Sequence, residues 1–234
     1  MSPDEQKRAA AVAALDYISD GMKVGLGTGS TADHFIDALG ERVKNGLRVI
    51  CVPTSIASQK RAFALGIALA SLDEQPQLDV TVDGADEILP VGLVLIKGGG
   101  GALTREKIVA ASSAKMVVIA DASKKMTADT FGAFPLPVEI LPFGAKSTMI
   151  KIEAVAQNLG MGGELKLRHS SDGKIFITDN GNWIVDYHLG HITSPEAFAA
   201  ALIAIPGVVE QGLFVSIGSV ALVAGKDGLE VLSA

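Results

Sequence analysis

The fold is decided by one stretch near the amino terminus, Lys23-Val24-Gly25-Leu26-Gly27-Thr28-Gly29-Ser30-Thr31. Its first four residues predict a short buried strand, its glycines predict a turn, and the apolar residues after it predict a helix. The alternation continues, with strands expected at 48–52, 77–82, 93–96 and 116–120 and helices at 53–65 and 103–111. Apolar strands alternating with helices predict an α/β fold with a mostly parallel sheet covered on both faces.

The composition changes at 131–137, where glycine and proline predict a linker. A strand is expected next at 138–141, a helix at 145–159, two strands at 175–178 and 183–187 around an Asn-Gly turn, and a helix after Ser194. This order predicts a smaller α+β domain of the split βαβ type. We expect strands at 213–215 and 220–223 to rejoin the first sheet. The chain is therefore predicted to form a larger domain from 1–130 and 207–234, with 131–206 inserted.

Charge and composition exclude several classes of protein. The 234 residues carry a formal charge of −6, which disfavours nucleic acid as a partner. The longest stretch without a charged residue or glutamine, 212–225, is too short to cross a membrane. The acidic amino terminus does not resemble a signal peptide, and the single cysteine, Cys51, allows neither an internal disulfide nor a cysteine zinc site. We therefore expect a cytoplasmic protein that is independent of membranes.

The turn Thr28-Gly29-Ser30-Thr31 is a candidate phosphate site, because free N–H groups and hydroxyls meet at the start of a helix. It lacks the lysine of a Walker A loop, and it lacks the third glycine and the later acid of a dinucleotide fingerprint. NAD is therefore disfavoured as a cofactor. The alternative is a tight turn with a hydroxyl cap. Two lysines, Lys7 and Lys124, are candidates for supplying positive charge to a phosphate, although either could be an ordinary surface lysine.

Two further polar segments follow predicted strands. Asp83-Gly84-Ala85-Asp86 could bind sugar hydroxyls, hold a metal or cap a turn. Lys97-Gly98-Gly99-Gly100-Gly101 opens a helix that carries Glu106. Because four glycines in succession are entropically unfavourable, they indicate close approach of the backbone to a ligand rather than a flexible linker. A lysine and a carboxylate beside such a loop are suited to abstracting a proton next to a carbonyl.

A metal site is not expected. The pair His188 and His191 flanks a glycine after a strand, without the helix and glutamate of zincin spacing. No histidine stands close in sequence to Asp83 and Asp86, and divalent metal sites need further ligands.

These motifs together resemble the ribose-5-phosphate isomerase A family. The resemblance covers nearly the whole chain in the family's order, through 27–31, 82–88, 97–100, 104–107, 120–124, 178–182 and 205–209. It implies a Rossmann-like α/β domain with an inserted α+β (ferredoxin-like) domain, assembled as a homodimer or homotetramer. It also implies interconversion of D-ribose 5-phosphate and D-ribulose 5-phosphate through a cis-enediolate, with no metal and no other cofactor.

The resemblance also implies roles for particular residues. Glu106 matches the proton acceptor, and the segments that match substrate-binding positions comprise Thr28, Gly29, Ser30, Thr31, Asp83, Gly84, Ala85, Asp86, Lys97, Gly98, Gly99, Gly100 and Lys124. Our hypothesis is that Glu106 moves the proton between C2 and C1 while Lys97 stabilises the enediolate. Asp83 or Asp86 would hold hydroxyls and help to open the furanose ring. Lys7 is kept as a candidate contact to the phosphate.

Two alternatives belong to other classes. A sugar-phosphate sensor can use a related fold, but it would not need Lys97 together with Glu106, and this chain has no basic DNA-binding extension. A metal-dependent isomerase would move a hydride, and its activity would be lost in EDTA.

Overall fold

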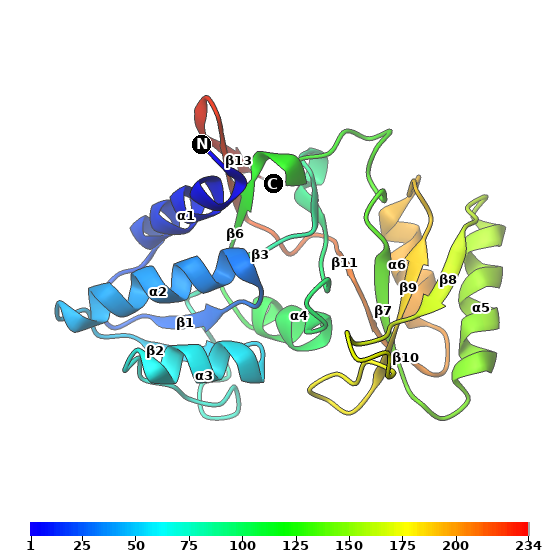
Figure 1. The fold of residues 1–234 in the computed structure, drawn as a ribbon, viewed down its shortest axis with the longest axis horizontal. Coiled ribbons are helices and arrows are strands. Elements are labelled where there is room, and N and C mark those ends of the chain that lie inside the picture. The colour runs from blue at the N-terminus through cyan, green and yellow to red at the C-terminus, as the bar shows by residue number, and fades with distance from the viewer. Residues whose placement is uncertain (234) are drawn as a thin grey trace.

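The computed structural model describes residues 1–233, and its largest unit is a six-stranded sheet in the order β13-β12-β6-β3-β1-β2. All neighbouring strands are parallel except β12 and β13. Figure 1 shows this sheet beside the smaller layers. The mostly parallel sheet is thus confirmed, and its strands are β1 (Lys23–Leu26), β2 (Ile50–Pro53), β3 (Val80–Gly84), β6 (Met116–Asp121), β12 (Val220–Gly225) and β13 (Gly228–Ser233).

Both faces of this sheet are covered, because alternate side chains of each strand point to opposite sides. Val117 and Ile119 of β6 belong to the core formed with α1 (Pro3–Ala14) and α2 (Ser30–Lys44). Val118 of β6 belongs to a second core that includes Ala110 of α4 (Leu103–Ala111). The helix α3 (Ile56–Ala64) packs beside β2 and α2, and short 3₁₀ turns occupy η1 (Leu15–Tyr17), η2 (Val91–Leu93) and η3 (Ala122–Lys124).

A separate three-stranded sheet, in the order β11-β5-β4, contains β4 (Glu87–Leu89), β5 (Val94–Ile96) and β11 (Leu213–Phe214). The expectation that 93–96 and 213–215 belong to the first sheet is therefore wrong. The cause is a chain reversal at Gly92, whose φ of 71° is favourable only for glycine, so that β5 pairs antiparallel with β4. This reversal sends Lys97, the residue after β5, back toward the end of β3.

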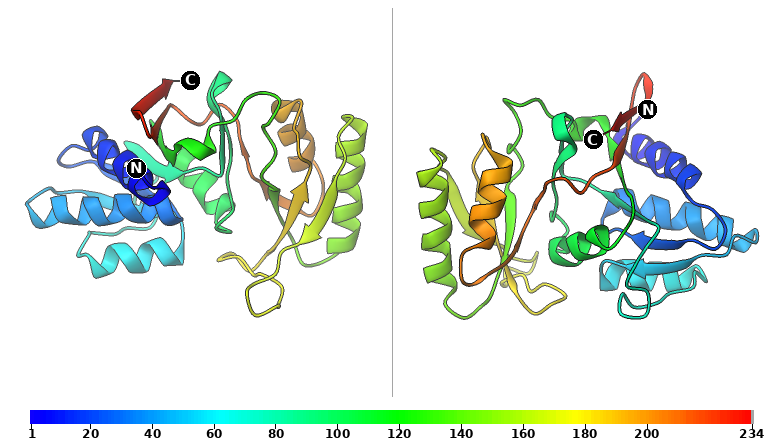
Figure 2. Two further views of the ribbon diagram at one scale, coloured as in Figure 1. Left: turned by 45° about the horizontal axis from the view of Figure 1, so that its top comes forward. Right: turned by 180° about the vertical axis from the view of Figure 1, so that it is seen from behind.

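The third layer is an antiparallel sheet in the order β10-β7-β9-β8, with two helices. Its β-α-β-β-α-β sequence is ferredoxin-like and confirms the predicted α/β fold with a smaller α+β unit. The chain reaches it in the green stretch after β6 and leaves it in the orange stretch toward β11 (Figure 2). Its elements are β7 (Leu136–Ile140), α5 (Ala145–Asn158), β8 (Glu164–Leu167), β9 (Trp183–His188), α6 (Pro195–Ile203) and β10 (Val208–Gln211).

Two local expectations fail in this part of the chain. The segment 131–137 is no solvated linker, since Phe131 is fully buried and the Glu87 carboxylate accepts the N–H groups of Gly132 and Phe134, each at 2.6 Å. The expected strand at 175–178 makes only isolated bridges, one of them between Ile177 and Trp183. β9 lies between β7 and β8, and the mixed charge of β8 gave no strand signal. Within residues 1–233, no helix has the length and apolar character to cross a membrane.

Candidate active site

The predicted site residues converge on one pocket of about 120 Å³ beside the carboxyl ends of β1 and β3. In open α/β sheets this edge is where ligands bind. Every predicted site residue except Asp83 lines the pocket, namely Lys7, Thr28, Gly29, Ser30, Thr31, Gly84, Ala85, Asp86, Lys97, Gly98, Gly99, Gly100, Glu106 and Lys124.

Two residues of the pocket lining, Lys97 and Glu106, form a buried charge cluster with Asp83. The Nζ of Lys97 lies 3.0 Å from Oδ2 of Asp83 and 3.3 Å from Oε2 of Glu106, and it donates a hydrogen bond of 2.6 Å to the Gly84 carbonyl. It also lies 5.4 Å from the ring centroid of Phe214 on β11. The two carboxylate oxygens have no well-aligned hydrogen bond despite these ion-pair distances. One ammonium therefore faces two carboxylates in a region from which water is largely excluded.

The cluster shifts the pKa of all three groups. Burial raises the pKa of Glu106 to about 8, because the nearby Lys97 ammonium only partly offsets the loss of water and the Asp83 carboxylate adds repulsion. Burial also raises the pKa of Asp83. For Lys97, burial acts to lower the pKa, but Asp83 and Glu106 outweigh it and the pKa lies above the ordinary value. The lysine therefore stays protonated, and a carboxyl of the cluster takes up a proton near neutral pH.

The two carboxyls have different partners. Oδ1 of Asp83 accepts the N–H groups of Thr28 at 3.1 Å and Gly84 at 2.7 Å, which favour its ionised form. Glu106 has no such backbone donors and faces only Lys97. Of the two carboxyls, Glu106 is the one that lines the pocket.

The N-terminus of α2 and two lysines also line the pocket. The helix begins after Gly29, whose φ is 107°, and no side chain caps its free N–H groups. The Nζ of Lys7 donates to Ser30 Oγ at 3.0 Å, and Lys124 lines the same pocket. A helix dipole, two lysines and free hydroxyls at one point are suited to an anion.

The sequence suggests that the Thr28 hydroxyl binds a phosphate, but in the structure it contacts other side chains of the protein. This hydroxyl lies 2.7 Å from Thr54 Oγ1 and donates to Ser55 Oγ at 2.8 Å, and Ser58 Oγ is 3.2 Å away. These contacts hold the turn against the start of α3. The hydroxyls that remain for a ligand in the turn are those of Ser30 and Thr31.

The glycine loop needs its glycines for two separate reasons. Gly98 has a φ of 107°, and a Cβ there would lie 2.9 Å from Leu103 Cβ. A Cβ on Gly99 would lie 2.5 Å from Asp86 Oδ1, and the Gly99 N–H donates to Asp86 Oδ2 at 2.7 Å. The loop is thus packed against an acid that also faces the pocket.

The sequence patterns did not indicate two residues of the four-stranded antiparallel sheet and its end. Glu139 on β7 is fully buried, and its carboxylate accepts hydrogen bonds from Thr178, Asn180 and Asn182 and from Thr104 on α4. Arg168, which follows β8, donates to the carbonyls of Gly98 and Gly99. A glutamate inside an apolar strand is a signal that could have indicated a buried network. Arg168 carries no comparable local signal, because its partners lie about seventy residues away.

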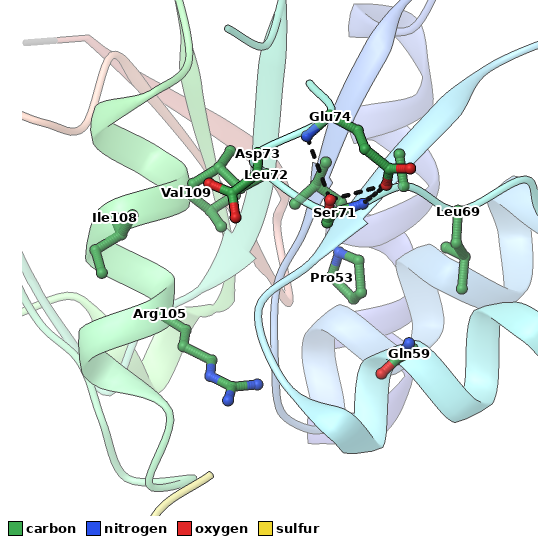
Figure 3. Close-up of a pocket in the computed structure, with 12 residues that line it drawn as sticks. Pro53, Gln59, Leu69, Ser71, Leu72, Asp73, Glu74, Arg105, Ile108 and Val109 are labelled. Carbon is green, nitrogen blue, oxygen red and sulfur yellow. Dashed lines mark hydrogen bonds between the residues drawn. The ribbon is translucent and has the colours of Figure 1, made fainter. Parts of the chain in front are cut away.

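A larger cavity of about 720 Å³ lies on the other side of α4 (Figure 3). Its walls come from α3, α4 and the segment 69–74, and they include Gln59, Glu74, Arg105 and Ile108. It contains none of the predicted site residues and none of the buried charge cluster. Separately, the residues from 1 to 233 contain no group of three or more histidine, cysteine, aspartate or glutamate side chains that could hold a metal ion. The charged pocket is therefore the candidate active site.

Known proteins are similar to this chain in sequence and in architecture. The family model described as Ribose 5-phosphate isomerase A (phosphoriboisomerase A) matches residues 50–228. A ribose-5-phosphate isomerase A of Rhodopseudomonas palustris (strain BisB18) is 55% identical, over 99% of each chain. The solved ribose 5-phosphate isomerase of Plasmodium falciparum matches with a TM-score of 0.93 and 38% identity over 99% of each chain. A solved D-ribose-5-phosphate isomerase in complex with phospho-erythronic acid matches with a TM-score of 0.93 and 37% identity over 100% of each chain. The chain belongs to the ribose 5-phosphate isomerase A family.

Proposed function

We propose that the protein interconverts D-ribose 5-phosphate and D-ribulose 5-phosphate by proton transfer through a cis-enediolate. The observation that carries this proposal is the buried pair of Glu106 and Lys97, 3.3 Å apart in the lining of a pocket that also contains the N-terminus of α2. Family membership supports the substrate. The solved relative in complex with phospho-erythronic acid supports a pocket that accepts a phosphorylated sugar acid.

Glu106 is the proposed base. A general base works best when its pKa lies near the working pH, and burial raises the pKa of Glu106 to about 8. Its carboxylate takes the proton from C2 of the open-chain aldose, the C2–H electron pair forms the C1=C2 bond, and the C1=O1 pair moves onto O1. Transfer of the O2 proton to O1 and return of the carried proton to C1 give the ketose. No proton or electron is gained or lost overall.

Lys97 is the proposed electrophile for the enediolate. Its ammonium is already held by Asp83 and by the Gly84 carbonyl, so it does not have to reorganise when negative charge develops on the substrate oxygens. Because Asp83 is fully buried and lies outside the pocket lining, we propose that it positions Lys97 rather than binding sugar. Asp86 lines the pocket and is the acid we assign to the hydroxyls and to ring opening.

The phosphate is proposed to bind at the N-terminus of α2, with Ser30, Thr31, Lys7 and Lys124. Binding energy gained at this remote group can be used to hold C1 and C2 against Glu106. The overall charge of −6 does not oppose this, because the potential at the pocket is set by the nearest groups.

We further propose the domain division into 1–130 with 207–234, forming the catalytic part, and the inserted 131–206. Within 207–234, the strand β10 pairs with β7 and so extends the sheet of the inserted part. We propose that the enzyme acts in the cytoplasm as a homodimer or homotetramer. The lone Cys51, which leaves the chain without an internal disulfide, supports a reducing compartment. Exposed Phe63 and Phe143 are apolar surface that assembly could cover.

The test is direct detection of ribulose 5-phosphate formed from ribose 5-phosphate. We expect turnover by the wild type, unaffected by EDTA, with tritium from solvent entering the sugar carbon. Glu106→Gln should lower kcat by about 10²–10⁴-fold with little change in KM. Glu41→Gln, on the exposed side of α2, is the matched control and should leave kcat unchanged. Absence of turnover by the wild type would favour a sugar-phosphate sensor, and loss of turnover in EDTA would favour a metal-dependent isomerase.

A further inference from the structure

The glycine loop at residues 98–101 poses a problem for catalysis. Its N–H groups can stabilise an enediolate only if they are fixed in advance, since preorganised donors are what lower the barrier. Four glycines have no side chains to pack and have more backbone freedom than any other residues. Some other part of the protein has to hold the peptide groups of this loop in one orientation.

Arg168 makes the contacts that can do this. Its Nη1 donates to the Gly98 carbonyl at 2.8 Å and to the Gly99 carbonyl at 3.2 Å. The Gly98 carbonyl also accepts the Gly101 N–H at 2.9 Å, so both of its acceptor positions are used. The Gly99 N–H is bound to Asp86. The peptide between Gly98 and Gly99 is therefore held at both its carbonyl and its N–H.

The next peptide is held at one end only. In a trans peptide the carbonyl and the N–H point in opposite directions. Because Arg168 binds the Gly99 carbonyl, the N–H of Gly100 points away from Arg168. It forms no hydrogen bond to any other residue within 1–233, and Gly100 lines the pocket together with Lys97 and Glu106. We infer that Arg168 is a positioning residue for the isomerisation, which holds the Gly99 carbonyl so that the Gly100 N–H faces the substrate oxygen that becomes negative.

The structure shows why an arginine fits this position. Asp186 on β9 accepts two parallel hydrogen bonds from Nε and Nη2 of Arg168, which leaves Nη1 free for the loop. The Arg168 N–H donates to the Ile184 carbonyl, so its backbone continues the pairing of β8 with β9. Arg168 thus extends from a hydrogen-bonded sheet and not from a mobile loop. A lysine has a single charged nitrogen and could not serve Asp186 and both carbonyls in this geometry.

The role of Arg168 is geometric rather than electrostatic. Its charge is paired with Asp186 at hydrogen-bond distance, and it does not line the pocket. Removal of the guanidinium should therefore leave phosphate binding intact and affect the step in which charge develops. This separates a positioning role from a substrate contact, which would change KM, and from a purely structural role, which would change stability without changing kcat.

The inference rests on the proposed function, and the test compares Arg168→Met, Arg168→Lys and the matched control Arg61→Met. Arg61 on α3 forms a similar forked pair with Asp37 on α2, and neither residue lines the pocket. We expect Arg168→Met to lower kcat by about ten- to a hundredfold, less than the loss of an oxyanion donor, while KM changes by less than about threefold. Arg168→Lys should recover part of the loss, and Arg61→Met should keep wild-type kcat.

A kcat for Arg168→Met within twofold of that for Arg61→Met would overturn the inference, as would a raised KM with unchanged kcat. If Arg168→Met does not fold, the kcat of Asp186→Asn tests the inference instead. This variant keeps the arginine and removes one of the two oxygens that accept its parallel hydrogen bonds. We expect Asp186→Asn to lower kcat severalfold at constant KM, and an unchanged kcat would again overturn the inference. An inactive wild type would instead refute the proposed function itself.

Discussion

Replacing Glu106 with glutamine should stabilise the protein at alkaline pH while it removes activity. Glutamine resembles the protonated carboxyl in shape and charge, so the variant lacks only the cost of ionising a buried acid. That cost follows from the pKa of Glu106, which burial raises from 4.5 to about 8. An acid with a higher pKa in the folded state binds its proton more tightly there, so stability is lost as the pH rises from the unfolded pKa through the folded pKa.

The size of the effect follows from the same values. The interval from 4.5 to about 8 corresponds to about 5 kcal/mol. Relaxation of the cluster around Lys97 reduces this upper value, and we expect a gain of about 2–5 kcal/mol for the variant above pH 8. Below the unfolded pKa both forms of the protein carry a neutral group, and the difference should vanish. The free energy of unfolding of the wild type should fall progressively below that of the variant as the pH rises from about 4.5 to 8.

The assay is urea unfolding of the wild type and Glu106→Gln at several pH values between 5 and 9, with the free energy extrapolated to water. Contributions from all other titrating groups largely cancel in the difference between the two proteins. Glu41→Gln serves as control and should give a difference that does not vary with pH, because Glu41 is exposed and paired only with Lys44 on the helix surface. A difference for Glu106→Gln that is flat across this range would refute the claim that the folded site raises the pKa of Glu106.

Three further predictions concern the groups around Glu106. Lys97→Met should destabilise the protein by about 3–5 kcal/mol in urea unfolding, because Asp83 would be left buried without its cation, and should reduce kcat below detection in the ketose assay. Gly98→Ala should destabilise it by about 1–3 kcal/mol more than Gly46→Ala, since both glycines have positive φ but only the Cβ at Gly98 meets packed atoms. Lys7→Met should raise KM for ribose 5-phosphate about tenfold, the value of one charge-assisted hydrogen bond, with kcat within threefold of wild type. Lys44→Met, at the other end of α2, should leave KM unchanged.

The sequence predicted best what depends on neighbouring residues. The strand, turn and helix around Thr28 to Thr31 and the helix carrying Glu106 are specified locally by apolar spacing and glycine, and the structure has them at those places. The position of the candidate site was also predictable, because parallel strands bring their carboxyl ends to one edge. What local patterns could not show is burial. Asp83 and Asp86 are indistinguishable in sequence, yet only Asp86 lines the pocket.

Long-range pairing explains the failures. The segment 131–137 has the composition of a linker, but Glu87 binds its backbone N–H groups from over forty residues away and allows it to be buried. The Asn-Gly turn at residues 179–182 was interpreted as a simple hairpin. Its asparagine side chains in fact bind Glu139, while Arg105 binds Asp179 and Asn180. In each case a distant carboxylate, Glu87 or Glu139, holds the local conformation through hydrogen bonds. The residue pattern of the segment itself gives no sign of that partner.

The four-stranded antiparallel sheet therefore supports the candidate site through hydrogen bonds, although it supplies no group to the proposed chemistry. Glu139 binds Thr104, two residues before Glu106, and Arg168 binds the loop that follows Lys97. The helix that carries Glu106 and the glycine loop are thus each bound by a side chain from the antiparallel sheet or its end, whereas Lys97 and the N-terminus of α2 follow strands of the other two sheets. A loop of four glycines cannot fix its own peptide groups, so the larger sheet alone would leave the enediolate donors free to turn. If Arg168 positions the loop as inferred, we expect turnover to depend on the antiparallel sheet through the contacts of Arg168 and Glu139.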